Sequence, residues 1–156
     1  MDSLEPLLRD HEFFRGLEPA YLALLVGCAS NVVFREGSFL FREGEPADRF
    51  FLLRHGKVAL EIAGPGHGAL IVQTVPEGGI IGFSWLFEPH RWQFDARAVE
   101  LTRAVALDGV CLRGKCQQDT RLGYDLMQRF ARVATQRLQA TRLQLLDVYG
   151  RAGAYR

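Results

Sequence analysis

Short hydrophobic runs separated by turn signals fill the middle of the chain. The β-rich runs lie at 32–34, 50–53, 58–62, 70–75, 94–98 and 103–107. Gly-containing turn segments lie between them, at 36–37, 43–46, 55–56, 64–68 and 76–79. Strands about ten residues apart with such turns are typical of an antiparallel sandwich or barrel. The pattern therefore predicts an all-β centre over about residues 31–108.

Both ends of the chain carry helical periodicity instead. Glu18 and Pro19 precede a leucine-rich run, which predicts a short helix with Pro at its first position. Towards the C-terminus, Asp119 and Thr120 form a capping pair. Apolar or seam-compatible residues then recur every three to five positions, at Leu122, Leu126, Phe130, Val133, Leu138, Thr141, Leu145 and Val148. This spacing predicts a long helix over about 120–149.

The predicted helix is long, so its apolar stripe needs a packing partner along its whole length. At about 1.5 Å per residue it would run about 40 Å, which is more than a small barrel covers. The simplest partner for the remaining apolar stripe is the same helix of a second subunit, so we expect a homodimer. The alternative is a helix that folds back over its own barrel.

Size and composition indicate one folded domain. A chain of 156 residues with 48% hydrophobic and 24% charged residues is ordinary for a globular domain and atypical of a disordered one. We expect one domain over 1–150 and a short tail over 151–156. The longest apolar stretch, 21–29, is too short to span a membrane, and the acidic start at Asp2 and Glu5 does not fit a signal peptide. We therefore expect a cytoplasmic protein without a membrane segment.

Charge is distributed unevenly along the chain. Residues 120–156 contain seven arginines, no lysine and two aspartates, whereas residues 1–119 contain more acidic than basic side chains. Such a tail is either a solvated helix face or a contact for an acidic protein partner or nucleic acid. Charge alone does not separate these interpretations.

The candidate metal ligands and nucleophiles form no recognisable site. Cys28, Cys111 and Cys116 are too few for a disulfide framework and are interpreted as packing residues in a reducing cytosol, and their spacing does not fit an iron–sulfur site. A metal-binding barrel is disfavoured because no closely spaced His-x-His pair occurs among His11, His55, His67 and His90. Haem has no positive support. No nucleophile stands at a recognisable spacing from a base, so we expect no enzyme and no metal.

Several segments carry a family resemblance. They are 41–48 (FREGEPAD), 51–58 (FLLRHGKV), 79–82 (GIIG), 136–142 (QRLQATR) and 146–151 (LDVYGR). With these segments in this order along the sequence, the chain resembles the cyclic-nucleotide-binding domain of the catabolite activator and fumarate-nitrate regulator superfamily. The resemblance implies a mainly β fold with flanking helices: a jelly-roll barrel followed by a C-terminal dimerisation helix. It also implies a regulatory, ligand-sensing role in signal transduction.

The nucleotide-binding cassette that this resemblance implies is altered. In the family, a Gly-Glu-Leu segment opens a short helix, its Glu accepts from the ribose hydroxyl, and a later Arg-Ser/Thr pair meets the phosphate. Here Gly82 is retained, Phe83 stands at the Glu position, and Trp92 and Gln93 stand at the Arg and Ser/Thr positions. Losing two charge-assisted contacts costs about 3–6 kcal/mol, or roughly 10²- to 10⁴-fold in affinity. Cyclic AMP or cyclic GMP would therefore bind weakly.

The remaining pocket candidates leave alternatives open. Phe83, Trp85, Trp92 and Phe94 either fill the cavity or line it for an apolar or planar molecule. Ser84 and Gln93 add polar groups. Arg91 is either a solvated loop residue or a substitute phosphate ligand after a register shift.

Two further residues of the pocket lie on the long helix. Thr141 matches a helix position that contacts the base in the family, and is otherwise a polar residue of a dimer seam. Arg142 stands where a small hydroxyl residue of the opposite subunit is implied. Either a nucleotide or another small molecule could be the ligand.

The number of residues after the long helix bears on whether a DNA-binding function is expected. Only 151–156 follow Gly150, too few for a helix-turn-helix, so no sequence-specific DNA binding is expected. We therefore expect a freestanding, non-catalytic sensor. The alternative is a ligand-independent dimeric adaptor whose pocket is plugged by aromatic rings.

Overall fold

The computed structural model describes residues 4–66 and 68–154. The helical elements are α1 (Glu5–Asp10), the 3-10 turn η1 (Glu12–Phe14), α2 (Pro19–Val26), the 3-10 turn η2 (Ser84–Leu86), α3 (Gly109–Gln118) and α4 (Thr120–Ala154). The strands are β1 (Ala29–Phe34), β2 (Phe39–Phe41), β3 (Arg49–His55), β4 (Val58–Ala63), β5 (Ala69–Val75), β6 (Ile80–Ile81), β7 (Asp95–Ala98) and β8 (Thr102–Asp108).

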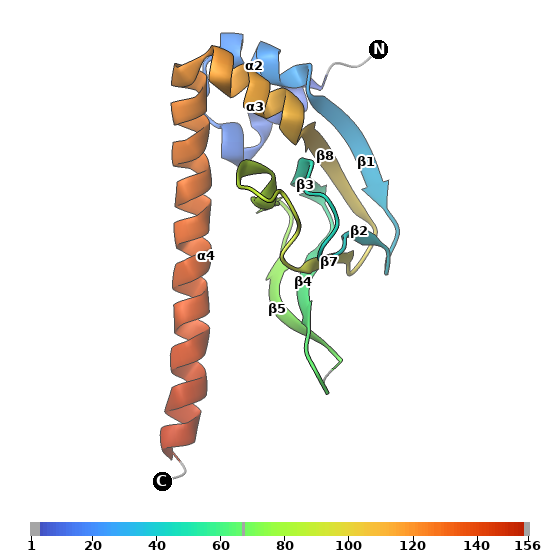
Figure 1. The fold of residues 1–156 in the computed structure, drawn as a ribbon, viewed down its shortest axis with the longest axis vertical. Coiled ribbons are helices and arrows are strands. Elements are labelled where there is room, and N and C mark those ends of the chain that lie inside the picture. The colour runs from blue at the N-terminus through green and yellow to red at the C-terminus, as the bar shows by residue number, and fades with distance from the viewer. Residues whose placement is uncertain (1–3, 67, 155–156) are drawn as a thin grey trace.

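The strands form two antiparallel sheets of four strands each. One has the order β1-β8-β3-β6 and the other β2-β7-β4-β5. Helices cap one end of the molecule and α4 runs along its side (Figure 1). The predicted β centre with flanking helices and a long C-terminal helix is therefore confirmed. Only the very short strands β2 and β6 had no counterpart among the predicted runs.

Strands β3 and β8 of the first sheet are buried on both faces, whereas β1 at the edge of that sheet is exposed or half-buried. Side chains alternate across a strand, so Phe50 and Leu52 of β3 pack against the helices, while Phe51 and Leu53 face the second sheet. The same alternation divides β8 between the two cores. The molecule therefore has three layers: helices, first sheet and second sheet.

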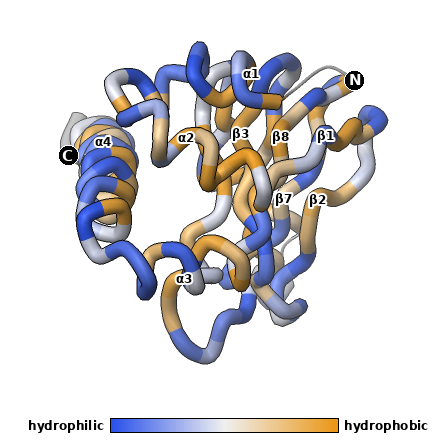
Figure 2. Tube along the Cα trace, turned by 90° about the horizontal axis from the view of Figure 1, so that it is seen from above, coloured by the Kyte–Doolittle hydropathy of each residue, from blue (hydrophilic) through white to orange (hydrophobic). Residues whose placement is uncertain are grey.

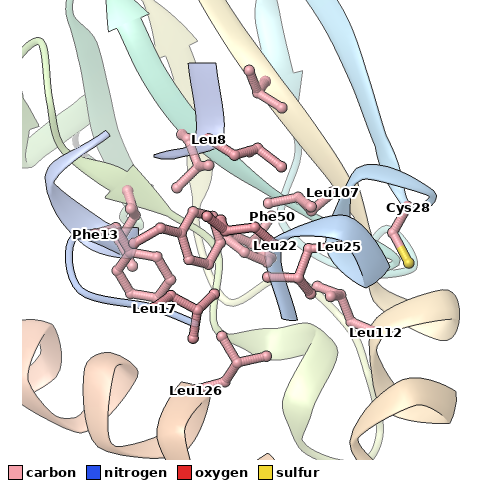
Figure 3. Close-up of a cluster of buried hydrophobic side chains, with 14 of the residues drawn as sticks. Leu8, Phe13, Leu17, Leu22, Leu25, Cys28, Phe50, Leu107, Leu112 and Leu126 are labelled. Atoms are coloured by element: carbon pink, nitrogen blue, oxygen red, sulfur yellow. The ribbon is translucent and has the colours of Figure 1, made fainter. Parts of the chain in front are cut away.

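The helical core joins α4 to the rest of the protein. Figure 3 shows this cluster, in which Leu22 and Leu25 of α2 lie near Phe50 and Leu107 of the sheet. From α4, the buried side chains are Leu122, Leu126 and Phe130. Only the first third of α4 is thus held by buried apolar contacts.

The helix starts follow the sequence signals. Pro19 is the first residue of α2, and the Asp119 carboxylate accepts hydrogen bonds from the backbone N–H groups of Arg121 and Leu122. The far end of α4 differs from expectation: the helix continues through Gly150 to Ala154 rather than ending near 149. Its 35 residues extend about 52 Å. Residues 155 and 156 of the expected tail, and His67, lie outside the described residues.

The prediction that all three cysteines are unbonded packing residues is wrong for two of them. Cys28 and Cys111 form a disulfide across 83 positions of sequence, with their Cα atoms 5.8 Å apart. The fold brings them together because the Asp108 N–H donates to the Cys28 carbonyl, which places the first turn of α3 beside the end of α2. Cys116 remains a thiol. Within the described ranges, no helix has the length and apolar character needed to cross a membrane.

Candidate ligand cleft

The segment around Gly82, where the family resemblance implies the nucleotide-binding cassette, is tightly packed. This residue adopts a φ of +109°, which favours glycine, and a Cβ there would lie 3.0 Å from Cη2 of Trp92. The indole N–H of Trp85 donates to the Gly82 carbonyl at 3.1 Å. Trp85 and Trp92 are both buried. Two indole rings therefore pack against Gly82.

Trp92 is fixed by both its ring and its backbone. The indole stacks on Phe41 at a centroid distance of 3.7 Å, with the planes 8° apart. Its backbone N–H donates to the Glu45 carbonyl, and its own carbonyl accepts from Gly44. A cavity of about 210 Å³ remains beside it. The lining residues are Leu40, Phe41, Glu45, Pro46, Asp48, Arg49, Phe51 and Trp92.

The four predicted pocket aromatics do not share one cavity. Phe83 and Trp85 belong to the helical core, whereas Trp92 and Phe94 belong to the core between the sheets. The first sheet separates the two groups, because the side chains of β3 and β8 alternate between the two cores. The sequence did not reveal this division, since all four residues fall within twelve positions of one another.

The polar candidates of the same segment face outward or are only half-buried. Arg91 is exposed and donates to the Gly44 carbonyl at 2.8 Å, and the exposed Gln93 amide donates to the Arg91 carbonyl. Ser84 is half-buried at the start of η2. Arg91 thus contacts the 44–47 turn and is exposed, whereas the adjacent Trp92 is buried.

The candidates on α4 lie away from the cassette. Thr141 and Arg142 are exposed, and the Thr141 hydroxyl donates to the Arg137 carbonyl within the helix. Neither residue has a described contact with the 82–93 segment. Their predicted role in a pocket shared between two subunits stays a prediction.

A larger cleft lies between α4 and the turn that joins β5 to β6. Its volume is about 590 Å³, within the size range of small-molecule sites. From above, α4 stands at the side of the molecule (Figure 2). The residues around the cleft are Glu12, Phe13, Arg15, Gln73, Val75, Pro76, Glu77, Gly78, Gly79, Ile80, Arg129, Arg132, Val133, Gln136, Arg137 and Ala140. None of them was a predicted site residue.

Arg137 is a half-buried cation of this cleft. Its guanidinium carbon lies 5.2 Å from the centre of the Phe83 ring, and burial lowers its pKa to about 10. The side chain therefore remains charged at neutral pH while much of its hydration is lost. The cleft can accordingly take a negative charge at this point. The sequence contained a signal for it, because Arg137 falls in the 136–142 segment that carries the family resemblance.

Comparisons with known proteins identify the fold. The pattern of the cyclic nucleotide-binding domain family matches residues 31–119. A candidate cyclic nucleotide-binding protein from Geobacter metallireducens GS-15 is 31% identical, with a TM-score of 0.77, covering 88% of this chain and 99% of that one. A cyclic nucleotide-binding domain from Methylobacillus flagellatus KT has a TM-score of 0.78 at 19% identity, covering 93% of this chain and 82% of that one, and shows the fold alone.

A longer relative is a transcriptional regulator. The CRP-like cAMP-activated global transcriptional regulator of Mycobacterium tuberculosis (strain CDC 1551 / Oshkosh) is 27% identical over 145 residues. These residues are 93% of this chain and 63% of the regulator, so the chain spans less than two thirds of that protein's length. The two antiparallel sheets and the long C-terminal helix agree with these matches: the chain belongs to the cyclic nucleotide-binding domain family.

Proposed function

We propose that this protein is a non-catalytic regulatory module with weakened cyclic-nucleotide binding. The observation that carries the proposal is the packing of Trp92 beside Gly82, where the family resemblance implies an arginine for the phosphate. An indole supplies no positive charge, and Phe83 supplies no carboxylate for a ribose hydroxyl. Cyclic AMP and cyclic GMP therefore lose both of the strongest contacts that the cassette would make.

The position of α4 suits it to transmit ligand occupancy. The cleft is bounded on one side by α4 and on the other by the 73–80 segment, so a ligand there touches two separate parts of the fold. Buried apolar contacts hold α4 only near its start. A ligand that binds one position of α4 more tightly than another would shift the helix between them.

The exposed side chains in the C-terminal half of α4 support the proposal of a homodimer. All side chains from Leu138 to Gly150 are exposed in the isolated chain. Leu138, Thr141, Leu145 and Val148 follow one another at spacings of three, four and three residues, and we call them the distal stripe. This is the repeat of a two-helix seam. A second copy of the chain, packed about a two-fold axis, would cover the stripe.

The packing of Trp92 also favours the second candidate function. If the stacked rings remain closed, the protein would act as a ligand-independent dimeric adaptor through α4 and its arginines. The two functions share the dimer and differ in whether a small molecule changes α4.

Sedimentation equilibrium of the full chain tests the shared part of the proposal. We expect a dimer at micromolar concentration, and Leu145→Glu should shift it to a monomer because two buried carboxylates would face each other across the seam. Val110→Glu, at an exposed apolar position on α3, is the matched control and should remain dimeric. A monomeric wild-type protein at 100 µM, or a dimer that survives Leu145→Glu unchanged, would contradict dimerisation through this stripe.

A further inference from the structure

The Cys28–Cys111 disulfide joins two helices that are already packed against the same core. Cys28 follows the end of α2 and Cys111 lies in the first turn of α3. The next residue of α3, Leu112, is fully buried in the helical core, and the Gly109 N–H donates to the Asp48 carbonyl at 2.7 Å. Domains that need disulfides in order to fold lack a core of this kind. The bond therefore adds to an α3 that other contacts also hold.

The two bonded cysteines differ in their access to solvent. Cys28 is 7% exposed, whereas Cys111 is half-buried and its neighbour Val110 is 61% exposed. In Figure 3 the Cys28 sulfur lies at the margin of the buried cluster rather than inside it. A disulfide is opened by a thiolate that reaches one of its two sulfur atoms. On this exposure, Cys111 offers the point of attack for a dissolved thiol.

The third cysteine stands apart from this bond. Cys116 follows Cys111 by five residues in α3, which places the two roughly 140° apart around the helix. It packs against the start of α4, where a Cβ at Gly123 would lie 3.2 Å from the Cys116 Cβ. Burial raises the pKa of its thiol, so at neutral pH the thiol stays protonated and is a weak nucleophile. The bond can therefore open and reform without exchange into Cys116.

Helix α3 connects this bond to α4. Asp119 alone separates the two helices, and Leu112 of α3 and Leu122 of α4 share the helical core. In Figure 1, α3 lies next to α2 and meets the upper end of α4. The bond fixes the first turn of α3 relative to α2. Opening the bond releases this restraint, and a shift of α3 is passed on to the start of α4.

Helix α3 also contacts the 84–86 turn. The Arg113 guanidinium donates to the Trp85 carbonyl, and a Cβ at Gly109 would lie 3.0 Å from the Trp85 Cβ. Trp85 is fully buried in the helical core, whereas Trp92 belongs to the core between the sheets. The two tryptophans of the chain therefore report on different regions, Trp85 on the position of α3 and Trp92 on the space between the sheets.

We propose that the Cys28–Cys111 disulfide is a redox site, which a dissolved dithiol reduces while the domain stays folded, and whose state sets how α3 holds the start of α4. A thiolate of the reagent attacks the Cys111 sulfur, the S–S bond breaks, and Cys28 leaves as a thiolate that takes up a proton. The second thiol of the reagent then displaces Cys111 and closes a cyclic disulfide. Two electrons and two protons thus pass from the reagent to the protein. The inference goes beyond the proposed function, because it needs neither a bound ligand nor a second subunit.

The rate of reduction tests whether a reagent reaches the bond in the folded protein. Dithiothreitol is added at pH 7.5 to the native full chain and, separately, to the chain unfolded in urea, and the thiols are alkylated and located by peptide mass spectrometry. We expect the native protein to be reduced less than about 10³-fold more slowly than the unfolded chain. A larger ratio would mean that the bond opens only when the whole domain unfolds, because the unfolded fraction of a stable domain is below about 10⁻³. That result would overturn the proposal.

The two indole N–H nuclear magnetic resonance signals test the coupling to α3. When the native protein is reduced, the Trp85 signal should move together with the backbone amide signals of residues 119–126, while the Trp92 signal stays in place. Oxidised glutathione should then restore both the bond and the original spectrum. Signals of Trp85 and 119–126 that do not move, a spectrum that does not return, or a Trp92 signal that moves as far as that of Trp85 would each overturn the proposal.

Cysteine variants assign the response. Cys116→Ser keeps the bond, so this matched control should respond to dithiothreitol as the wild type does. Cys28→Ser/Cys111→Ser should show the reduced position of the Trp85 signal with and without the reagent. A response that persists in the double variant, or that is lost in Cys116→Ser, would assign it to Cys116 and overturn the proposal. None of these measurements involves a nucleotide or the dimer, so failure here is distinguishable from failure of the proposed function.

Discussion

Trp92 and Phe41 stack face to face, with their ring centroids 3.7 Å apart and their planes 8° from parallel. The pair joins the segment after the cassette to β2, which is otherwise a strand of only three residues. Because Cη2 of the same indole lies 3.0 Å from the place of a Cβ at Gly82, the stack also fixes the start of the cassette. One ring thus packs against both Phe41 and the Gly82 backbone, at a position where the family resemblance implies a phosphate-binding arginine.

Removing the Trp92 indole should lower the free energy of unfolding substantially. Trp92→Ala deletes a 4% exposed side chain next to an existing cavity, and we expect the free energy of unfolding to fall by about 3–5 kcal/mol in urea denaturation. Phe87→Ala, at a 65% exposed ring, is the control and should change it by less than about 0.5 kcal/mol. A loss below about 1 kcal/mol for Trp92→Ala would show that the indole is not an integral part of the core.

The disulfide gives a prediction about thiol content and stability. Alkylation of the unfolded, unreduced protein should label one cysteine, Cys116, and reduction should expose three. Reduction should lower the free energy of unfolding by about 2–4 kcal/mol, because Cys28 and Cys111 close a long loop. The Cys28→Ser/Cys111→Ser double variant should be as stable with reductant as without it. Labelling of all three cysteines before reduction would contradict the bond.

His11 predicts a pH dependence of stability. Its Nδ1 accepts from the Phe13 N–H at 3.1 Å, its Nε2 lies 3.3 Å from the Leu53 carbonyl, and burial lowers its pKa. The folded protein then binds a proton less readily than the unfolded chain, whose histidine titrates near 6.5. This contribution to stability is therefore present above pH 6.5 and is lost as the pH falls through the lowered pKa.

The matched variant for this effect is His11→Asn. An asparagine oxygen can still accept from the Phe13 N–H, but the side chain does not titrate. Unfolding measured from pH 7.5 to 5 should show a smaller loss of stability for His11→Asn than for the wild type. Parallel curves for the two proteins would assign the acid sensitivity to other groups.

Local signals in the sequence predicted most of the fold. Pro19 and Asp119 mark helix starts through backbone chemistry that acts within three residues, and the strands follow from alternation over a few positions. Strands β2 and β6 are too short to show such alternation. The pairing of Cys28 with Cys111 depends on where α2 and α3 meet, and that position is set by packing across the whole domain rather than by spacing.

The candidate site was less predictable for the same reason. The sequence predicted Phe83 and Trp92 as departures from the cassette, which stays a prediction, but it could not show that the two side chains belong to different cores. It also drew attention to Thr141 and Arg142, whereas the cleft reaches only to Ala140. The contact of the Arg137 guanidinium with the Phe83 ring depends on how α4 packs beside the 82–86 segment, which local sequence does not specify.

Calorimetric titration with cyclic AMP and cyclic GMP tests most directly whether Phe83 and Trp92 have weakened the nucleotide site. We expect the wild-type protein to bind either nucleotide no more tightly than high micromolar, and the Phe83→Glu/Trp92→Arg double variant to bind at least about tenfold more tightly, because it regains both charged contacts. A nanomolar dissociation constant for the wild-type protein would contradict the account.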